Sequence, residues 1–318
     1  MESTVFVGVD VSQDTLDIAS EDATQIKVIA NQGSAVRRWL KSLPNTALIG
    51  VESTGCLHQL LVREAITAGH TVYVLNARDL SHYARALGRR AKTDRLDALL
   101  IARYLKKEHD RLHPFKLPSP LQIKLDELIR RRHKIVVAHG AVRASLNSTQ
   151  CKLKSAAALI RAFKSTLAEI DQQLQALVQQ DQTLAVHAQN LRSVVGFGPL
   201  LSASLSHAIT RHPFKNDDAF IAYVGYDPRV RDSGQLKGRR FLSKHGPSEL
   251  RRLLFTAAMS ACNSKLWRPV YQHYRDRGFS STAALCILAR KLARIAFSIV
   301  KYRTHFDPTR IKIPCAQP

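Results

Sequence analysis

The sequence has no paired cysteine motif, no long apolar run and few acidic residues for its length. Its cysteines are scattered, odd in number and never in a Cys-x-x-Cys arrangement: Cys56, Cys151, Cys262, Cys286 and Cys315. This pattern argues against a disulfide framework or a zinc site and favours a reducing, cytoplasmic compartment. No apolar run approaches the length of a membrane span, and the first residues lack the layout of a signal peptide. We therefore expect no membrane partner.

The shortage of acidic charge is large. The 318 residues, enough for two domains, include 25 Asp and Glu against 48 Lys and Arg, which gives a net charge of +23. Such an excess implies a polyanionic partner, with nucleic acid ahead of an acidic membrane. Charge alone does not identify the function, because every protein that binds a polyanion shows a steep salt dependence.

Glycine-rich phosphate loops are also absent from the sequence. Sugar kinases and actin-like ATPases open with a Gly-x-Asp strand, as this chain does at Gly8-Val9-Asp10. They bind nucleotide phosphates through glycine-rich loops further along the chain. The lack of such loops argues against a kinase or ATPase.

The first third of the chain has the pattern of an α/β domain. Short β-branched runs at residues 5–10, 16–19 and 25–29 predict an antiparallel meander. A helix at 35–43, a strand at 47–52, a helix at 57–68, a strand at 71–75 and helical segments over 78–105 are expected next. Three antiparallel strands followed by alternating helix and strand describe an RNase H-like fold.

Four acidic residues occupy positions that this fold brings together. Asp10 and Glu52 end two strands expected to be neighbours, and Asp94 and Asp97 lie three residues apart on one helical face. Four carboxylates so close need a cation between them, and oxygen ligands suit Mg²⁺ or Mn²⁺. The structural alternatives are that Asp94 caps the helix with Asp97 in its first turn, that Asp10 is a turn residue, and that Glu52 is a loop residue.

Basic residues surround the helical pair of acids and are candidates to hold a nucleic-acid backbone. They are Arg89, Arg90, Lys92 and Arg95. A phosphodiester-cleaving metal site needs this combination, because the carboxylates hold the metal and the protein cations hold the phosphates.

The middle of the chain is predicted to be all-helical. Pro114, Pro118 and Pro120 mark a linker, and residues 121–181 contain almost no Gly or Pro. Apolar residues at spacings of three and four predict two long helices paired as a coiled coil or bundle arm, which often carries self-association. Gly196-Phe197-Gly198-Pro199 predicts either a phosphate-binding helix–hairpin–helix turn or a tight turn between packed helices.

The last part contains a basic, loop-like stretch followed by amphipathic helices. Ser243 lies in this stretch near the start of a helix and is the candidate nucleophile. Lys237, Arg239, Arg240 and Lys244 would neutralise a phosphate beside it. Alternatively, the Ser243 hydroxyl bonds only its own backbone. Ser233 and Ser248 compete for the role, although Ser248 is better explained as part of a first helical turn.

Taken together, these motifs resemble the IS110 family of insertion-sequence transposases and Piv-type DNA invertases. The resemblance covers essentially the whole chain and rests on the order and spacing of the motifs. In the N-terminal half they are Gly8-Val9-Asp10, Val51-Glu52-Ser53-Thr54-Gly55 and Lys92-Thr93-Asp94-Arg95-Leu96-Asp97-Ala98. In the C-terminal half they are Gly196-Phe197-Gly198, Ser233-Gly234, Ser243-Lys244-His245-Gly246 and Leu250-Arg251-Arg252.

The resemblance implies a RuvC-like Asp-Glu-Asp-Asp domain at residues 1–112, a coiled-coil arm at 113–186 and a mostly helical domain with the serine nucleophile at 187–318. It implies recombination of donor and target DNA, chosen by pairing to a structured noncoding RNA, through a phosphoserine intermediate and in a tetramer with composite active sites. It also implies a bacterial protein that associates with the nucleoid. The main alternative is a RuvC-like structure-selective endonuclease that uses metal-activated water, and the third is an RNA-binding scaffold without catalysis.

Overall fold

The computed structural model describes residues 4–22, 25–45, 47–53, 57–88, 94–147, 153–230 and 240–311, except for the side chains of residues 94–96, 230 and 240. The chain divides into two compact units, residues 1–117 and 118–318. The three-part division expected from the sequence stays a prediction. Within the described ranges, no helix combines the length and apolarity that a membrane crossing requires.

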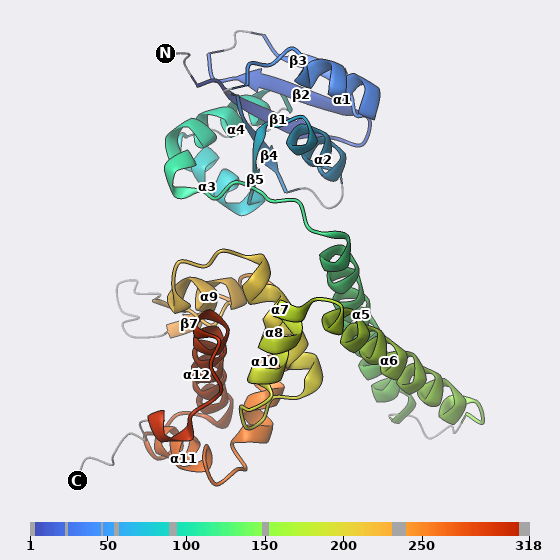
Figure 1. The fold of residues 1–318 in the computed structure, drawn as a ribbon, viewed down its shortest axis with the longest axis vertical. Coiled ribbons are helices and arrows are strands. Elements are labelled where there is room, and N and C mark those ends of the chain that lie inside the picture. The colour runs from blue at the N-terminus through green and yellow to red at the C-terminus, as the bar shows by residue number, and fades with distance from the viewer. Residues whose placement is uncertain are drawn as a thin grey trace. The chain divides into compact units, whose positions relative to one another are not determined.

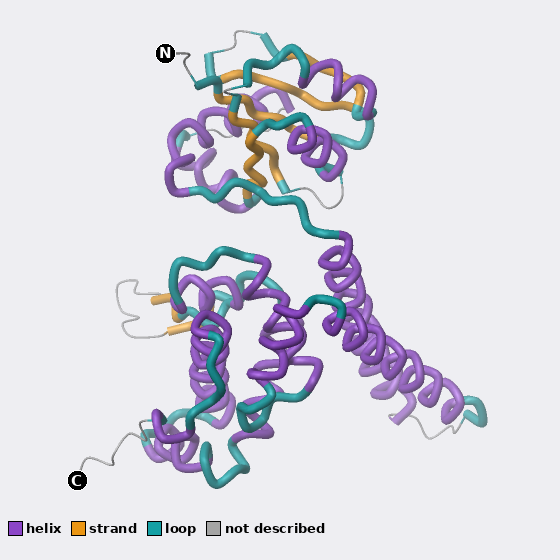
Figure 2. Tube along the Cα trace, viewed as in Figure 1, coloured by secondary structure: helices purple, strands orange, loops and turns teal. Residues whose placement is uncertain are grey.

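The first unit is built on a mixed five-stranded sheet (Figures 1 and 2). Its strands are β1 (Phe6–Val11), β2 (Thr15–Ser20), β3 (Lys27–Ala30), β4 (Leu48–Glu52) and β5 (Thr71–Leu75). Their order is β3-β2-β1-β4-β5, with β1 to β3 antiparallel and β1, β4 and β5 parallel. The predicted antiparallel meander and the two strands that follow it are confirmed.

Helices cover both faces of this sheet. They are α1 (Gly33–Leu40), α2 (Gln59–Thr67), α3 (Ala77–Ala86), α4 (Asp94–Glu108) and the short η1 (His109–Arg111). Alternate β1 residues Val7, Val9 and Val11 belong to a core with α1 and α2. Phe6 points the other way and packs with residues of α3 and α4. Because side chains alternate along a strand, the even-numbered residues of β1 face α4.

In its described residues, the second unit is helical apart from one small hairpin. Its helices are α5 (Pro120–Asn147), α6 (Ala156–Gln179), α7 (Gln182–Leu191), α8 (Pro199–Arg211), α9 (Asp217–Val224), α10 (Ser248–Ala261), α11 (Arg268–Asp276), α12 (Ser281–Tyr302) and the short η2 (Pro308–Arg310). The hairpin pairs β6 (Pro228–Val230) with β7 (Arg240–Leu242) in antiparallel register. The sequence predicted a loop here. The hairpin was missed because a strand of three residues is too short to show a recognisable alternating pattern.

The predicted pair of long helices is confirmed. Helices α5 and α6 lie side by side (Figure 1) and share an apolar cluster that includes Leu125, Leu128, Ile170 and Leu174. This cluster continues onto α7 and α8, so the pair is joined to the other helices of its unit by a common core.

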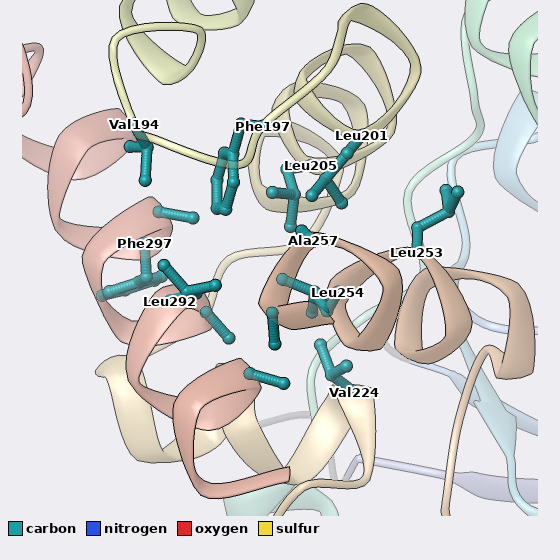
Figure 3. Packing of buried hydrophobic residues seen from close by; sticks show 14 of the residues in the cluster. Val194, Phe197, Leu201, Leu205, Val224, Leu253, Leu254, Ala257, Leu292 and Phe297 are labelled. Carbon is teal, nitrogen blue, oxygen red and sulfur yellow. The ribbon is translucent and has the colours of Figure 1, made fainter. Parts of the chain in front are cut away.

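The larger core of the second unit lies between α8, α10 and α12. Figure 3 shows Leu205, Leu254 and Leu292 directed toward one another from these three helices. Small residues on α12, such as Ala289 and Ala293, are fully buried and let the helices approach closely. The spacing of apolar residues predicts α10 and α12, whereas α7, α9 and α11, of ten, eight and nine residues, are not predicted by it.

Candidate active site

Asp10 and Glu52 lie at the carboxyl ends of two neighbouring parallel strands. Val9 pairs with Val51 across β1 and β4, so Asp10 and Glu52 are the next residue of each strand. Both are even-numbered and both side chains are half-buried on the face that α4 covers. Although the two acids are more than forty residues apart in sequence, the parallel register brings them together, as predicted.

Two glycines let α4 cross this face at close range. A Cβ on Gly8 would overlap the backbone of Ala98 and Ala102 and lie 2.9 Å from Ile101 Cβ. A Cβ on Gly50 would lie 3.1 Å from Ile101 Cγ2. Each glycine precedes its acid by two residues on the same face, so α4 lies directly on the approach to both carboxylates.

The direction of α4 places its first turns toward Asp10. The ring of His109, just after α4, lies 4.9 Å from the ring of Phe6 at the start of β1. Ala98 lies over Gly8, two residues further along β1. The helix therefore runs antiparallel to β1, and its first turns, with Asp97, lie nearest the end where Asp10 is found. We call Asp10, Glu52 and Asp97 the carboxylate edge.

A further acid that the sequence reading missed lies beside this edge. Asp17 of β2 is directly opposite Asp10 in the antiparallel register. Its neighbours Leu16 and Ile18 point into the core on the opposite face, so Asp17 shares the α4 face with Asp10. Like charges directly opposite each other destabilise a sheet unless a cation or hydrogen-bond donor lies nearby. A prediction of the β1–β2 register from the turn at residues 12–14 would have found this residue.

The structure describes the side chains of three of the four acids that the sequence predicts to bind a metal ion. Asp94 is the first residue of α4, but its side chain lies outside the described residues. Among the side chains that the structure describes, no three of His, Cys, Asp and Glu gather closely enough to hold a metal ion. The donors are nonetheless of the right kind, because carboxylate oxygens are the ligands that Mg²⁺ and Mn²⁺ prefer. One oxygen of Asp10 accepts a hydrogen bond from the Val11 amide at 3.0 Å.

The candidate nucleophile Ser243 lies immediately after β7, in a segment of residues 243–246 that we call the serine loop. The Ser243 hydroxyl donates a hydrogen bond to the carboxylate of Asp227, and its amide donates to the Asp227 carbonyl at 3.0 Å. The His245 amide approaches Ser243 Oγ at 3.4 Å. Asp227 and His245 therefore hold the Ser243 hydroxyl in place. The side chain is half-buried and keeps some exposure to solvent.

The serine loop is pressed against the end of α9. A Cβ on Gly246 would overlap the carbonyl oxygen of Tyr223, and Gly246 has a φ of 74°. Arg251 of α10 donates to the carbonyls of Val224 at 2.8 Å and His245 at 2.9 Å, tying the loop to α9. Lys244 has a φ of 54°, a left-handed conformation that costs a non-glycine residue free energy. Such strain is retained where the surrounding contacts impose one loop geometry.

Ser248 and Gly196, two further candidate residues, both have a structural explanation. Ser248 opens α10, as predicted for a residue of the first helical turn. Gly196 has a φ of 99°, and a Cβ there would lie 2.8 Å from the Ala257 carbonyl oxygen, so packing against α10 accounts for it. The predicted phosphate-binding role of that turn is not needed to explain the glycine.

Most of the candidate basic residues cannot be placed. Those wholly outside the described residues are Arg89, Arg90, Lys92, Lys237 and Arg239, together with Ser233 among the serines. Arg95 and Arg240 belong to α4 and β7, but their side chains are not described. Lys244 is described and belongs to the serine loop.

A buried acid, Glu249, links the first turn of α10 to α5. Glu249 is 6% exposed and accepts hydrogen bonds from Arg252 at 2.7 and 2.8 Å and from His133 Nδ1 of α5 at 2.9 Å. Burial by itself raises the pKa of Glu249, but the Arg252 and His133 contacts outweigh it and lower the pKa below its usual value. Arg132 of α5 in turn binds Asp171 of α6 at 2.6 Å.

Comparison with known proteins extends these observations across the chain. Residues 7–149 match a family model described as "Transposase", of the DEDD type in the IS110 family. Residues 188–273 match a model described as "Transposase IS116/IS110/IS902 family". The first match contains the carboxylate edge and the second contains the serine loop.

Curated relatives align over almost their whole length. A pilin gene-inverting protein of Moraxella bovis is 26% identical over 96% of this chain and 98% of its own. Its counterpart in Moraxella lacunata is 26% identical with the same coverage. A probable family 20 transposase of Pseudomonas aeruginosa is 25% identical over 95% of this chain and 98% of its own.

Proposed function

We propose that this chain, which belongs to the IS110 family of transposases and DNA invertases, cuts and rejoins donor and target DNA under the guidance of a structured noncoding RNA. The chain is a site-specific recombinase by family, and its relatives are named for DNA inversion and transposition. The net charge of +23 supports partners that are DNA and RNA together. We further propose that the first unit has a RuvC-like fold, on the basis of its β3-β2-β1-β4-β5 strand order.

The observation that carries the proposal is the arrangement of the carboxylate edge. Asp10 and Glu52 end adjacent parallel strands, and α4, in which Asp97 precedes Ala98, packs over the same face. We propose that these three acids and Asp94 hold a divalent cation, Mg²⁺ or Mn²⁺, as the DEDD-type family suggests. When bound, such a cation polarises the scissile phosphate and stabilises the leaving oxygen. The basic residues Arg89, Arg90, Lys92 and Arg95 would hold the DNA or RNA backbone nearby.

Ser243 is the proposed nucleophile. Its Oγ attacks the scissile phosphorus and forms an O–P bond, the bond from phosphorus to one DNA oxygen breaks, and that oxygen leaves as a free hydroxyl after protonation. A hydroxyl of the exchanging strand then attacks the phosphoserine and releases Ser243, so no external energy source is needed. Lys244, with Lys237, Arg239 and Arg240, would neutralise the phosphate charge during both steps.

The two sets of proposed catalytic residues belong to different compact units of the chain. The carboxylate edge belongs to the first compact unit and the serine loop to the second. We propose that the two meet between different subunits of a homo-oligomer, arranged as a dimer of dimers, with the α5–α6 pair as the self-association arm.

The test combines three variants with the RNA that accompanies the protein. The full chain is purified from cells that carry its own flanking DNA, and the co-purified RNA is sequenced and used in a recombination assay. Ser243→Ala should abolish covalent protein–DNA adducts and recombination while keeping RNA binding, and Asp97→Asn should do the same. Asp276→Asn, at the end of α11, serves as the acidic control and should recombine normally. Cleavage that yields free ends without an adduct would support the endonuclease instead, and intact recombination by Ser243→Ala would refute the nucleophile.

A further inference from the structure

The carboxylate of Asp227 is the hydrogen-bond acceptor of the Ser243 hydroxyl. The two residues are sixteen positions apart and are brought together by the β6–β7 hairpin. Pro228 pairs with Leu242, so Asp227 and Ser243 are the next residues outward on the two strands. The amide of Ser243 also donates to the Asp227 carbonyl at 3.0 Å, which fixes both the side chain and the backbone of the serine against one residue.

A serine hydroxyl is a weak nucleophile until a base takes its proton. A candidate base must lie within hydrogen-bond reach of that proton, and the Asp227 carboxylate does. Ser243 Oγ receives the His245 amide at 3.4 Å, so its contact with Asp227 is the one in which the hydroxyl is the donor. Among the described residues, the charged or titratable groups around this loop include Lys244, His245, Tyr226, Arg251 of α10 and Cys286 of α12.

We propose that Asp227 is the general base for Ser243, a role that rests on the proposed nucleophilic function of that serine. As Oγ bonds to phosphorus, its proton passes to an Asp227 carboxylate oxygen, while the bond between phosphorus and the leaving DNA oxygen breaks and that oxygen takes a proton from water. In the second step a DNA hydroxyl gives up its proton to water as it attacks the phosphoserine, and the departing Oγ takes the proton back from the Asp227 carboxyl. The same residue therefore acts as base in the first step and as acid in the second, and it is restored after strand exchange.

The surroundings of Asp227 hold it in this position. Gly225 at the end of α9 has a φ of 80°, and a Cβ there would lie 2.7 Å from the His245 amide nitrogen. The adjacent Tyr226 is 1% exposed, and its hydroxyl donates to the Arg251 carbonyl at 2.9 Å. Pro228 follows with its fixed φ. Asp227 thus lies between a buried tyrosine, which follows a tightly packed turn, and a proline, as a positioned base requires.

The alternative is that Asp227 only anchors the loop, and asparagine separates the two roles. Asp227→Asn keeps the size and an oxygen that can accept from Ser243 Oγ, but it cannot hold a proton as a base. Asp227→Ala removes both properties. Asp218→Asn is the matched control, because Asp218 lies on α9 in the same unit and pairs with Arg294 rather than with the serine loop.

The experiment measures single-turnover formation of the covalent protein–DNA adduct as a function of pH, using the full chain with its co-purified RNA and its own flanking DNA. Asp227→Asn should slow adduct formation by about 10²–10⁴-fold. It should also change the dependence of the rate on pH, whereas Asp218→Asn should match the parent. Thermal unfolding of each variant shows whether it is folded. In a Ser243→Cys background the penalty of Asp227→Asn should shrink, because a thiol ionises near pH 8.5 and needs less help from a base.

An Asp227→Asn rate close to that of the parent would overturn the assignment. So would a slower rate that keeps the parent pH profile, since this would indicate positioning alone, or an undiminished penalty in the Ser243→Cys background. These results are distinct from failure of the nucleophile itself, which would be seen as adduct formation by Ser243→Ala.

Discussion

The carboxylate edge and the serine loop are both built where a glycine lets two backbones meet, but different forces hold them. At the carboxylate edge, regular elements pack through apolar side chains, with α4 lying on Gly8 and Gly50. In the serine loop, backbone carbonyls and side-chain donors from three segments converge, and Arg251 bridges two of them. The first arrangement depends on shape and burial, and the second depends on individual hydrogen bonds.

This difference predicts how each site responds to the loss of a contact. Apolar packing is distributed over many contacts, so a small loss at one position is shared. The conformation of a hydrogen-bonded loop depends on a few donors and acceptors. Removing one of them leaves its buried partner without a hydrogen bond. Variants of matched chemistry in the two regions should therefore fail in different ways.

The largest effect is expected at Gly8. Alanine there would overlap the backbone of Ala98 and Ala102, so α4 would have to move away from β1. We expect Gly8→Ala to lower the free energy of unfolding by about 3 kcal/mol and to abolish recombination. At Gly50 the nearest atoms are the ends of Ile101, Leu105 and Leu75 side chains at 3.1 to 3.3 Å, so Gly50→Ala should cost only about 1 kcal/mol. Urea denaturation gives both values, and an equal cost at both positions would contradict the close crossing at Gly8.

The serine loop should fail in activity before it fails in stability. Gly246→Ala combines a left-handed backbone with overlap on the Tyr223 carbonyl, and we expect a cost of about 2 kcal/mol and loss of adduct formation. Gly278→Ala is the control, because Gly278 has a similar φ of 83° with no atom within 4 Å of the added Cβ. It should cost about 1 kcal/mol and leave the adduct yield unchanged. Equal behaviour of the two variants would show that the contact with Tyr223 is unimportant.

Glu249 tests the hydrogen-bonded network that joins α10 to α5. Glu249→Gln should destabilise the second unit by about 1–3 kcal/mol, because Arg252 and His133 lose a charged acceptor. The pKa of Glu249 is lowered in the folded chain, so its stabilising contribution is present above the unfolded value of about 4.3 and is lost as the pH falls through the folded value. The stability difference between parent and variant should therefore narrow below about pH 4.

Glu127→Gln is the matched control for that measurement. Glu127 pairs with Arg131 one helical turn away on α5, and both side chains are more than half exposed, at 55% and 59%. Exposed pairs contribute little, so the variant should unfold within about 0.5 kcal/mol of the parent. A pH-independent effect of Glu249→Gln would argue against a charged role for the acid.

The smallest effect is expected at Lys244. Asparagine tolerates the left-handed conformation and removes the charge, so Lys244→Asn should keep the loop geometry. If Lys244 contacts one phosphate, the slope of log affinity against log salt should fall by about 0.9, with a loss in affinity of less than about tenfold. DNA binding measured from low to moderate salt gives the slope, and an unchanged slope would exclude the contact.

Sequence patterns predicted the first site better than the second, for a physical reason. Val5 to Asp10 and Ala47 to Glu52 are apolar runs that end in an acid, and strand pairing turns such runs into neighbours by a general rule. Spacing along a helix likewise predicts Asp94 and Asp97 on one face, and this stays a prediction because the Asp94 side chain lies outside the described residues. These inferences need only the period of the element and the order of the strands.

The partners of Ser243 could not be predicted in this way. Asp227 lies beside Ser243 because of a hairpin of two three-residue strands. Arg251 binds the serine loop from α10, and the apolar stripe of that helix does not predict the contacts of its polar face. Asp17 was missed because the register of β1 and β2 decides which acids face each other. Such contacts depend on the tertiary fold and leave no periodic signal in the sequence.

The most direct test of the account is peptide mapping by mass spectrometry of the protein–DNA adduct formed with Mg²⁺. The account predicts a deoxynucleotide phosphate on Ser243, present in the parent chain and absent from Asp97→Asn. An adduct on another residue, or cleaved DNA with no adduct at all, would contradict it.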